Sequence, residues 1–143
     1  MTLLLSLAFA CHLVAILVSI SFGLTYLLRS QFMPYHAVAL GKEWREVPSE
    51  VQILVLALMR AVGGGTLATA LVTSFVLFIP FRTGEIWALW AVASGGLVLS
   101  AGSLFAMRIV AANTPASPPF KLVLLGLALV VIGFALSLAA GAQ

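Results

Sequence analysis

Residues 3–28 read LLLSLAFACHLVAILVSISFGLTYLL and contain no Asp, Glu, Lys or Arg. Three later segments share this character, at residues 61–81, 86–107 and 122–143. About 20 helical residues, rising 1.5 Å each, are enough to cross the roughly 30 Å hydrocarbon core of a bilayer. Because backbone N–H and C=O groups must be paired inside lipid, these segments predict four transmembrane helices.

Composition supports the same interpretation. Of the 143 residues, 63% are hydrophobic and only 8% are charged, whereas about 25% of the residues of a soluble domain are charged. A soluble domain this short would expose too much of that apolar surface to water. The sequence therefore predicts one all-α integral membrane domain over residues 1–143, an up-down-up-down bundle of four transmembrane helices. We place the helices at about 3–28, 50–80, 85–108 and 120–141, with an interfacial loop at 29–49.

The two ends of the interfacial loop carry local signals. Pro34 suits a first helical turn and Gly41 a helix end, which predicts a short helix over residues 34–40. Ser49 and Gln52 have the spacing of a capping box for the second long helix. We interpret the first apolar segment as a transmembrane helix and not a cleaved signal peptide, because no basic residue precedes it.

Basic residues predict the orientation. One side of the predicted bundle holds six of them, and Arg82 is alone on the other; the six are Arg29, Lys42, Arg45, Arg60, Arg108 and Lys121. The positive-inside rule then places both termini on the non-cytoplasmic side. The basic residues are also scattered over several loops. This argues against a nucleic-acid partner, because such a partner needs a clustered basic surface.

Small residues predict where the helices meet, since lipid offers no hydrophobic gain for helix contact. The second and third long helices carry two glycine groups, and we expect these helices to pack closely through them: Gly63, Gly64, Gly65, Gly95, Gly96 and Gly102. Trp87 and Trp90, at the start of the third long helix, are predicted anchors at the headgroup level. Trp44 is expected to do the same on the other side.

His12 falls near the middle of the first apolar segment, and an ionisable group at that depth is a candidate functional residue. One hypothesis is an axial ligand to a haem or chlorophyll-type ring, or a proton relay. The other is a neutral imidazole bonded to a neighbouring hydroxyl, for which the candidates are Thr73, Ser74 and Ser100. With His36 as the only other histidine, we expect no histidine-rich metal site.

Most of the charged residues lie between residues 29 and 60, together with several aromatic residues. We expect this polar cap to contact a lipid headgroup or a partner through Arg29, Tyr35, His36, Trp44, Arg45 and Arg60. Glu43 and Glu46 have the chemistry of a general acid and base. A solvated loop with mutual ion pairs explains the same residues.

Several short phrases resemble those of a group of small four-helix bacterial inner-membrane proteins of unknown function. They are MPYH (33–36) with ALG (39–41), LMR (58–60) with GG (63–64), PFRTGEIWALW (80–90) and NTP (113–115). The resemblance spans most of the chain. It implies the same fold and a bacterial inner membrane, and it implies no activity.

The function expected from the sequence is a non-catalytic accessory or structural subunit of a larger membrane complex, contacting a pigment, haem or lipid. Its partners would be membrane lipids and other integral membrane subunits. One alternative is a membrane enzyme that handles lipids or small molecules with the polar cap. The other is a homo-oligomeric transporter, which is disfavoured because the middles of the last three helices lack Asp, Glu, His and Lys.

Overall fold

The structure, a computed structural model, describes residues 2–141 and is all-helical over them. Its elements in chain order are α1 (Leu3–Leu28), α2 (Pro34–Leu40), the 3-10 helix η1 (Trp44–Glu46), α3 (Ser49–Phe78), α4 (Ile86–Asn113) and α5 (Phe120–Gly141). The four long helices α1, α3, α4 and α5 are each long and apolar enough to cross a membrane. The sequence prediction of four such helices is therefore confirmed.

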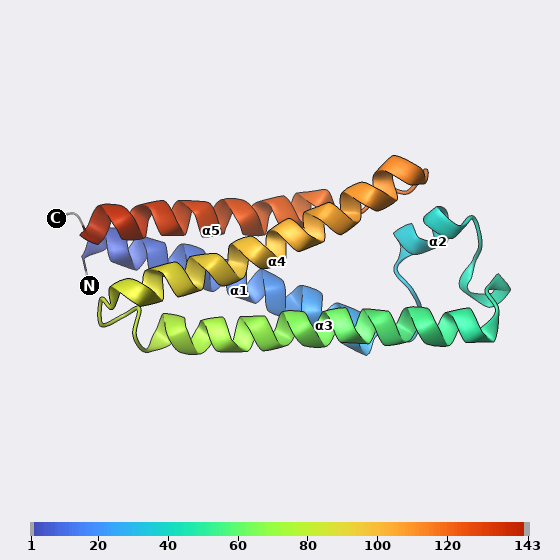
Figure 1. Cartoon of the computed structure of the whole chain (residues 1–143), viewed down its shortest axis with the longest axis horizontal. Coiled ribbons are helices and arrows are strands. Elements are labelled where there is room, and N and C mark those ends of the chain that lie inside the picture. Colours follow the sequence, from blue (N-terminus) through green and yellow to red (C-terminus); the bar gives the residue numbers. More distant parts are fainter. Residues whose placement is uncertain (1, 142–143) are drawn as a thin grey trace.

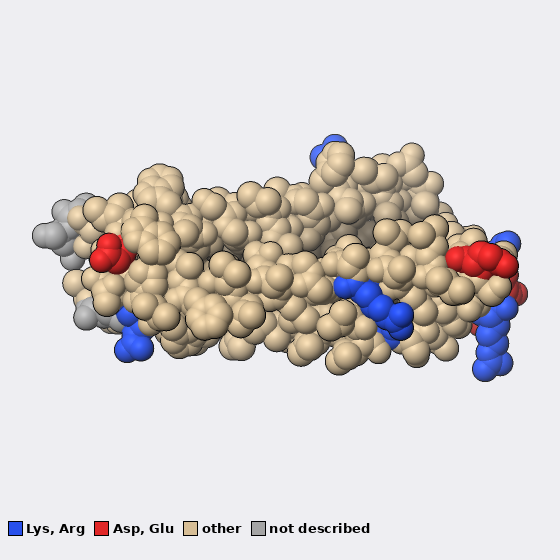
Figure 2. All heavy atoms as spheres, turned by 60° about the horizontal axis from the view of Figure 1, so that its bottom comes forward, with Lys and Arg blue, Asp and Glu red and all other residues tan. Residues whose placement is uncertain are grey.

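The long helices lie side by side along one axis of an elongated molecule (Figure 1). The start of α1 and the end of α5 lie at the same end as the turn that joins α3 to α4, and α2 and η1 lie at the opposite end. In Figure 2, a broad stretch without charged side chains separates the charges at the left-hand end from those on the right-hand half. All eleven charged side chains are exposed.

The predicted short helix over residues 34–40 is confirmed as α2. It begins at Pro34 and ends at Gly41, whose φ of 63° places it in the left-handed region that glycine favours. Helix α4 extends past the predicted end at residue 108. Arg108 is exposed and does not interrupt it, and the helix ends only before Thr114, which is extended as expected for a residue that precedes a proline.

The expected capping box at Ser49 is wrong. Pro48 occupies the N-cap and Ser49 is already helical, so the serine hydroxyl does not cap the helix. The Gln52 amide instead donates hydrogen bonds to the carbonyl oxygens of Trp44 and Val47, at 2.8 and 3.0 Å. Gln52 therefore fastens η1 and the connection after it to the first turn of α3.

Helix α1 is the centre of the packing, with its most extensive contacts to α3 and α5. Its backbone meets that of α3 at Gly23 and Gly63. A Cβ atom on Gly63 would lie 2.7 Å from the carbonyl oxygen of Gly23 and 2.7 Å from the backbone nitrogen of Leu27. Glycine is the only residue that fits there without separating the two helices.

The other glycines on the predicted packing surfaces differ in their surroundings. A Cβ on Gly96 would lie 2.6 Å from Val130 of α5, and one on Gly95 would lie 3.3 Å from the Thr73 hydroxyl of α3. Cβ atoms on Gly64, Gly65 and Gly102 would meet nothing within 4 Å. Successive helical residues point about 100° apart, so three adjacent glycines cannot all face one neighbour.

The second and third long helices are in contact, as expected, but theirs is not the most extensive contact in the bundle. The contact between α3 and α4 is less extensive than those of α1 with α3 and with α5. The tightest approaches pair α1 with α3 and α4 with α5.

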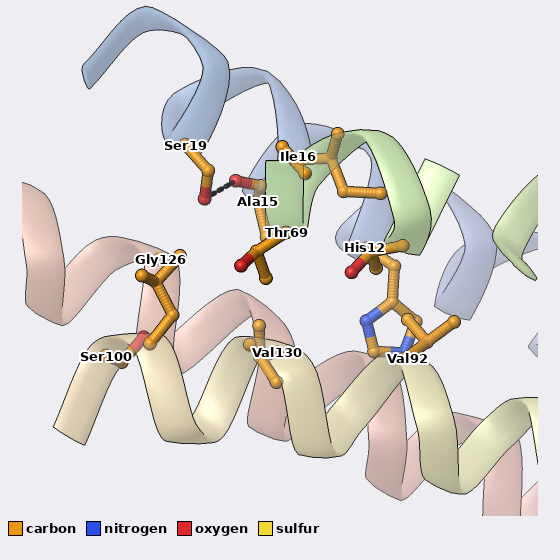
Figure 3. A pocket seen from close by; sticks show the side chains of 13 residues that line it. His12, Ala15, Ile16, Ser19, Thr69, Val92, Ser100, Gly126 and Val130 are labelled. Carbon is orange, nitrogen blue, oxygen red and sulfur yellow. Dashed lines mark hydrogen bonds between the residues drawn. The ribbon is translucent and has the colours of Figure 1, made fainter. Parts of the chain in front are cut away.

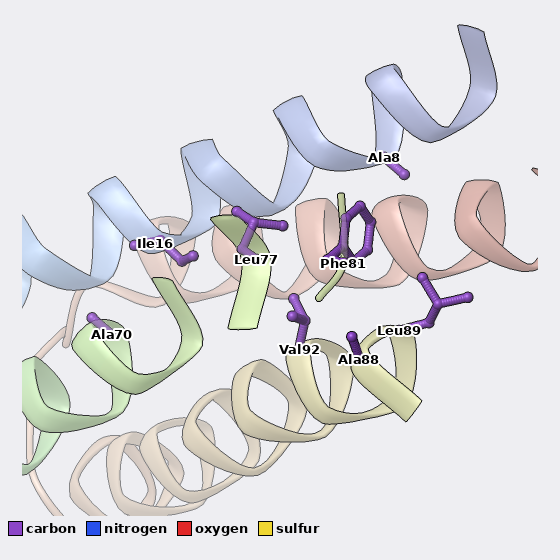
Figure 4. Close-up of a cluster of buried hydrophobic side chains, with 8 residues drawn as sticks. All are labelled: Ala8, Ile16, Ala70, Leu77, Phe81, Ala88, Leu89 and Val92. Atoms are coloured by element: carbon purple, nitrogen blue, oxygen red, sulfur yellow. The ribbon is translucent and has the colours of Figure 1, made fainter. Parts of the chain in front are cut away.

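The main apolar cluster lies toward the end where the chain begins (Figure 4). Its buried members are Ala8, Ile16, Ala70, Leu77, Phe81, Ala88, Leu89 and Val92. Phe81 belongs to the turn between α3 and α4, and its side chain is fully buried. This aromatic ring fills the space between the long helices at that end.

We predict that Gly63→Ala destabilises the fold by about 1–3 kcal/mol, the usual cost of overpacking. The added methyl group would meet the backbone of α1, which cannot move as a side chain can. Thermal unfolding in a mild detergent measures the effect. Gly65→Ala is the matched control, since open space surrounds that position; an equal loss in both variants would contradict the contact.

Candidate functional site

A cavity of about 430 Å³ lies among α1, α2, α3 and α4, toward the end of the molecule where α2 lies. We call it the groove. Its wall is formed by the last turns of α1, the length of α2, the α3 stretch from Val55 to Val62 and the α4 stretch from Ser103 to Val110. Figure 2 shows the surface hollowed on this half of the molecule.

The polar part of the groove is a cluster of three rings from α1 and α2. The hydroxyl groups of Tyr26 and Tyr35 are hydrogen-bonded to each other. The His36 ring lies edge-on to the Tyr35 ring, with centroids 4.2 Å apart, and edge-on to the Tyr26 ring at 6.5 Å. Helix α2 therefore brings two hydrogen-bonding side chains of its own to the end of α1.

His36 has a defined hydrogen-bonding role. Its Nδ1 accepts from the backbone N–H of Met33 at 3.3 Å, so in the neutral ring Nε2 carries the proton. Burial lowers the pKa of His36 below its usual 6.5, which keeps the ring neutral at neutral pH. Burial also raises the pKa of Tyr35, although the hydrogen bond from Tyr26 opposes that rise. The cluster thus offers hydrogen bonds without a net charge.

The rest of the groove wall is mostly apolar. Met59 of α3 and Met107 of α4 are buried and line it together with Leu58, Val62 and Val110. Methionine side chains are flexible and polarisable, so they adapt to ligands of differing shape. Ser103 is the one polar side chain here, and its hydroxyl donates to the carbonyl oxygen of Leu99 at 2.8 Å. This wall can accommodate an apolar chain, with the ring cluster at its α2 end.

The structure brings together two of the polar-cap residues predicted from the sequence and leaves the others apart. Tyr35 and His36 line the groove, whereas Arg29, Arg45 and Arg60 are exposed and do not line it. Trp44 packs edge-on against Phe32, with centroids 4.9 Å apart.

The two carboxylates considered as an acid–base pair are also outside the groove. Glu46 accepts a hydrogen bond from the backbone N–H of Glu43 at 2.8 Å, at the start of η1. That carboxylate therefore caps a helical turn.

Sequence reasoning missed Tyr26, Met59 and Met107 as groove residues. Tyr26 carried a weak signal, since a tyrosine near the end of an apolar segment often has a hydrogen-bond partner when buried. The two methionines carried none, because a methionine in an apolar helix is indistinguishable from core or lipid-facing residues.

His12 lies in a second, much smaller site at the centre of the bundle. It is 1% exposed, and neither ring nitrogen has a hydrogen-bond partner. A Cβ on Gly133 of α5 would lie 2.9 Å from the ring, and the ring of Phe81 lies edge-on with its centroid 5.7 Å away. The imidazole is therefore enclosed by α1, α5 and the turn before α4.

The hydroxyl partners expected for His12 are not bonded to it. Thr73 and Ser100 line the cavity beside the ring, and Ser74 donates to the carbonyl oxygen of Ala70 at 2.7 Å. This cavity has a volume of about 40 Å³, far less than a haem or chlorophyll-type ring occupies. Axial ligation by His12 would require the helices around it to separate.

The predicted tryptophan anchors lie toward both ends of the molecule. Trp87 and Trp90 are exposed on the first turns of α4, and Trp90 lies edge-on to Phe134 of α5 at 4.9 Å. Trp44, in η1, is half-buried at the opposite end. The anchoring role of all three stays a prediction.

A scan against protein-family models finds no family that matches this chain, and searches of curated proteins and of solved structures find no match either.

We predict that acid destabilises the protein through His36. The lowered pKa means that the unfolded chain binds a proton more readily than the folded one below about pH 6.5. The stability that His36 contributes is thus present above that pH and is lost as the pH falls. Thermal unfolding in detergent between about pH 7.5 and about pH 5 should show a steeper decline for the natural chain than for His36→Gln. Equal declines in stability in the two proteins would contradict the assignment to His36. His12 is present in both proteins, so it cannot cause a difference between them.

Proposed function

We propose that this chain is a non-catalytic integral membrane protein. Its groove would bind the apolar tail of a lipid-class amphiphile. The observation that carries the proposal is the shape and chemistry of the groove. An apolar cavity of about 430 Å³ has hydrogen-bonding rings at its α2 end. Ligand sites are typically of this size and combine apolar walls with a few placed polar groups.

Membrane insertion is the first part of the proposal, and the length and apolar character of the four long helices support it. Exposed leucine, isoleucine, valine and phenylalanine side chains occur on all four of these helices, which suits hydrocarbon better than water. We further propose an up-down-up-down bundle with the α2 end on the cytoplasmic side, because that end carries most of the basic residues. The resemblance described above suggests a bacterial inner membrane.

The polarity of the groove supports an amphiphile over a wholly apolar ligand. Its ring cluster lies toward the end that also carries α2, η1 and the charged loop, where the headgroup layer would be. The apolar stretch of α3 and α4 extends from there toward the middle of the helices. A lipid whose polar end meets Tyr35 and His36 would place its tail along that stretch.

A binding role is proposed in preference to catalysis because the charged residues of the polar cap do not meet in the groove. Arg60 and Glu46 are exposed and lie outside its wall. The groups that do meet, Tyr26, Tyr35 and His36, are suited to hydrogen bonding.

Lipid binding is tested by a photoactivatable fatty-acyl phospholipid added to the protein in mild detergent. Ala106→Trp should weaken capture at least about tenfold, because the indole occupies space for several methylene groups worth about 0.8 kcal/mol each. Ala106 lines the groove, whereas Ala101 is exposed on the same helix outside it. Ala101→Trp should therefore capture lipid normally. Equal capture by both variants would refute the proposal, as would cross-links confined to residues outside the groove.

A second candidate function, membership of a larger complex, has its own supporting observation. Gly65 faces outward on α3 with open space around it, and Ala61 and Ala68 are exposed near it. Small residues at this spacing allow another transmembrane helix to approach closely. We propose that a neighbouring subunit packs there.

The complex is tested by gentle extraction from native membranes followed by sizing. The natural chain should elute in an assembly heavier than its own 15.0 kDa, and Gly65→Leu should elute as a smaller species with its helical content unchanged. Ile53→Ala, a change at an exposed position about three turns before Gly65 on α3, is the control and should leave the assembly intact. Elution of the natural chain as a free monomer would exclude this function.

A further inference from the structure

We infer that the small cavity beside His12 is a hydration site that holds ordered water hydrogen-bonded to the imidazole. This inference is independent of the proposed lipid groove, because the two cavities share no lining residue. It concerns the centre of the bundle, where α1, α3, α4 and α5 all contribute to the wall.

The first observation is the unsatisfied imidazole. His12 is 1% exposed and neither of its nitrogens has a partner among the residues that the structure describes. Buried polar side chains almost always have a hydrogen-bond partner, either protein or water. Leaving one unpaired costs about 1–3 kcal/mol. The ring therefore requires a partner that the surrounding side chains do not supply.

The second observation is the size of the adjoining cavity. Its volume of about 40 Å³ is enough for at least one water molecule, which occupies roughly 10–15 Å³ as a probe sphere. It is too small for a lipid chain or a macrocycle. Water is the ligand whose dimensions fit.

The third observation is the polarity of the wall. Four hydroxyl groups surround the cavity, from Ser19 of α1, Thr69 and Thr73 of α3 and Ser100 of α4. In Figure 3 the His12 ring projects between the helices, and Ser19, Thr69 and Ser100 line the space beside it. A purely apolar cavity of this size would stay dry, but a bound water needs two to four polar partners, and this wall provides them.

The hydrogen bonds already made by these hydroxyls leave them free to accept. Ser19 donates to the carbonyl oxygen of Ala15 at 3.0 Å, and Thr69 donates to that of Gly65 at 2.9 Å. Their oxygen lone pairs are then available to a water proton. His12 is the only titratable residue in the wall, so the wall carries no carboxylate that would favour a cation over neutral water.

Gly126, at the end of the cavity away from His12, offers a way to reduce the volume of this site without disturbing the packing. It lines the cavity, and a Cβ atom there would meet nothing within 4 Å. Gly126→Val therefore adds its side chain to the free space. Gly102→Val is the matched control, since Gly102 is also in open space and does not line the cavity.

The test is solid-state NMR of the ¹⁵N-histidine-labelled protein in phospholipid bilayers, on a His36→Gln background so that His12 gives the only imidazole signals. Magnetisation transferred from water should reach the His12 ring nitrogens in the natural cavity and in Gly102→Val. It should be reduced in Gly126→Val, because the cavity is then smaller and holds less water, with Gly126→Ala used if the valine variant does not fold.

Two results would overturn the inference. One is a folded protein in which the ring nitrogens receive no transfer from water. The other is transfer that persists unchanged in Gly126→Val, which would show that the water reaches His12 elsewhere. A direct coupling of a ring nitrogen to the hydroxyl of Thr73 or Ser100 without water contact counts as the first result.

Discussion

The backbone contact between α1 and α3 at Gly23 and Gly63 determines how the rest of the molecule is arranged. The missing side chain at Gly63 lets the two helices touch. A Cβ atom on Gly63 would also lie 3.1 Å from the Cβ of Tyr26. Tyr26 is thereby held against α3 with its hydroxyl toward α2, where it meets Tyr35. Met59, one turn before Gly63 on α3, lies in the same buried cluster as Tyr26. The groove residues Tyr26 and Met59 thus lie next to the point where the backbones of α1 and α3 meet.

The two ends of the bundle differ because their connections differ. At one end a short turn buries Phe81 between the long helices and closes the space with a well-packed cluster. At the other end, the longer connection folds into α2 and η1 and is fastened to α3 by Gln52. It supplies Tyr35 and His36 to the wall but leaves the space between α3 and α4 unfilled. The cavity is a consequence of this unequal filling.

The long helices could be predicted from the sequence because a charge-free run of this length has few other stable conformations in lipid. The short helix α2 could also be predicted, since Pro34 and Gly41 act through local backbone geometry. The choice of packing partners could not be predicted. These helices are apolar on every side, so no periodic pattern shows which face is buried. For the same reason the sequence did not distinguish Gly63 from Gly64, or mark Met107 as a groove residue.

Helices α3 and α5 differ in length, with 30 and 22 residues. At 1.5 Å per residue they measure about 45 Å and about 33 Å. A bilayer that matches the shorter helix leaves more than two turns of the longer one outside the hydrocarbon, unless that helix tilts. Such hydrophobic mismatch is relieved by tilting or by local changes in bilayer thickness. The free energy of inserting the protein would then depend on membrane thickness. Membranes of a particular thickness would therefore be favoured over others.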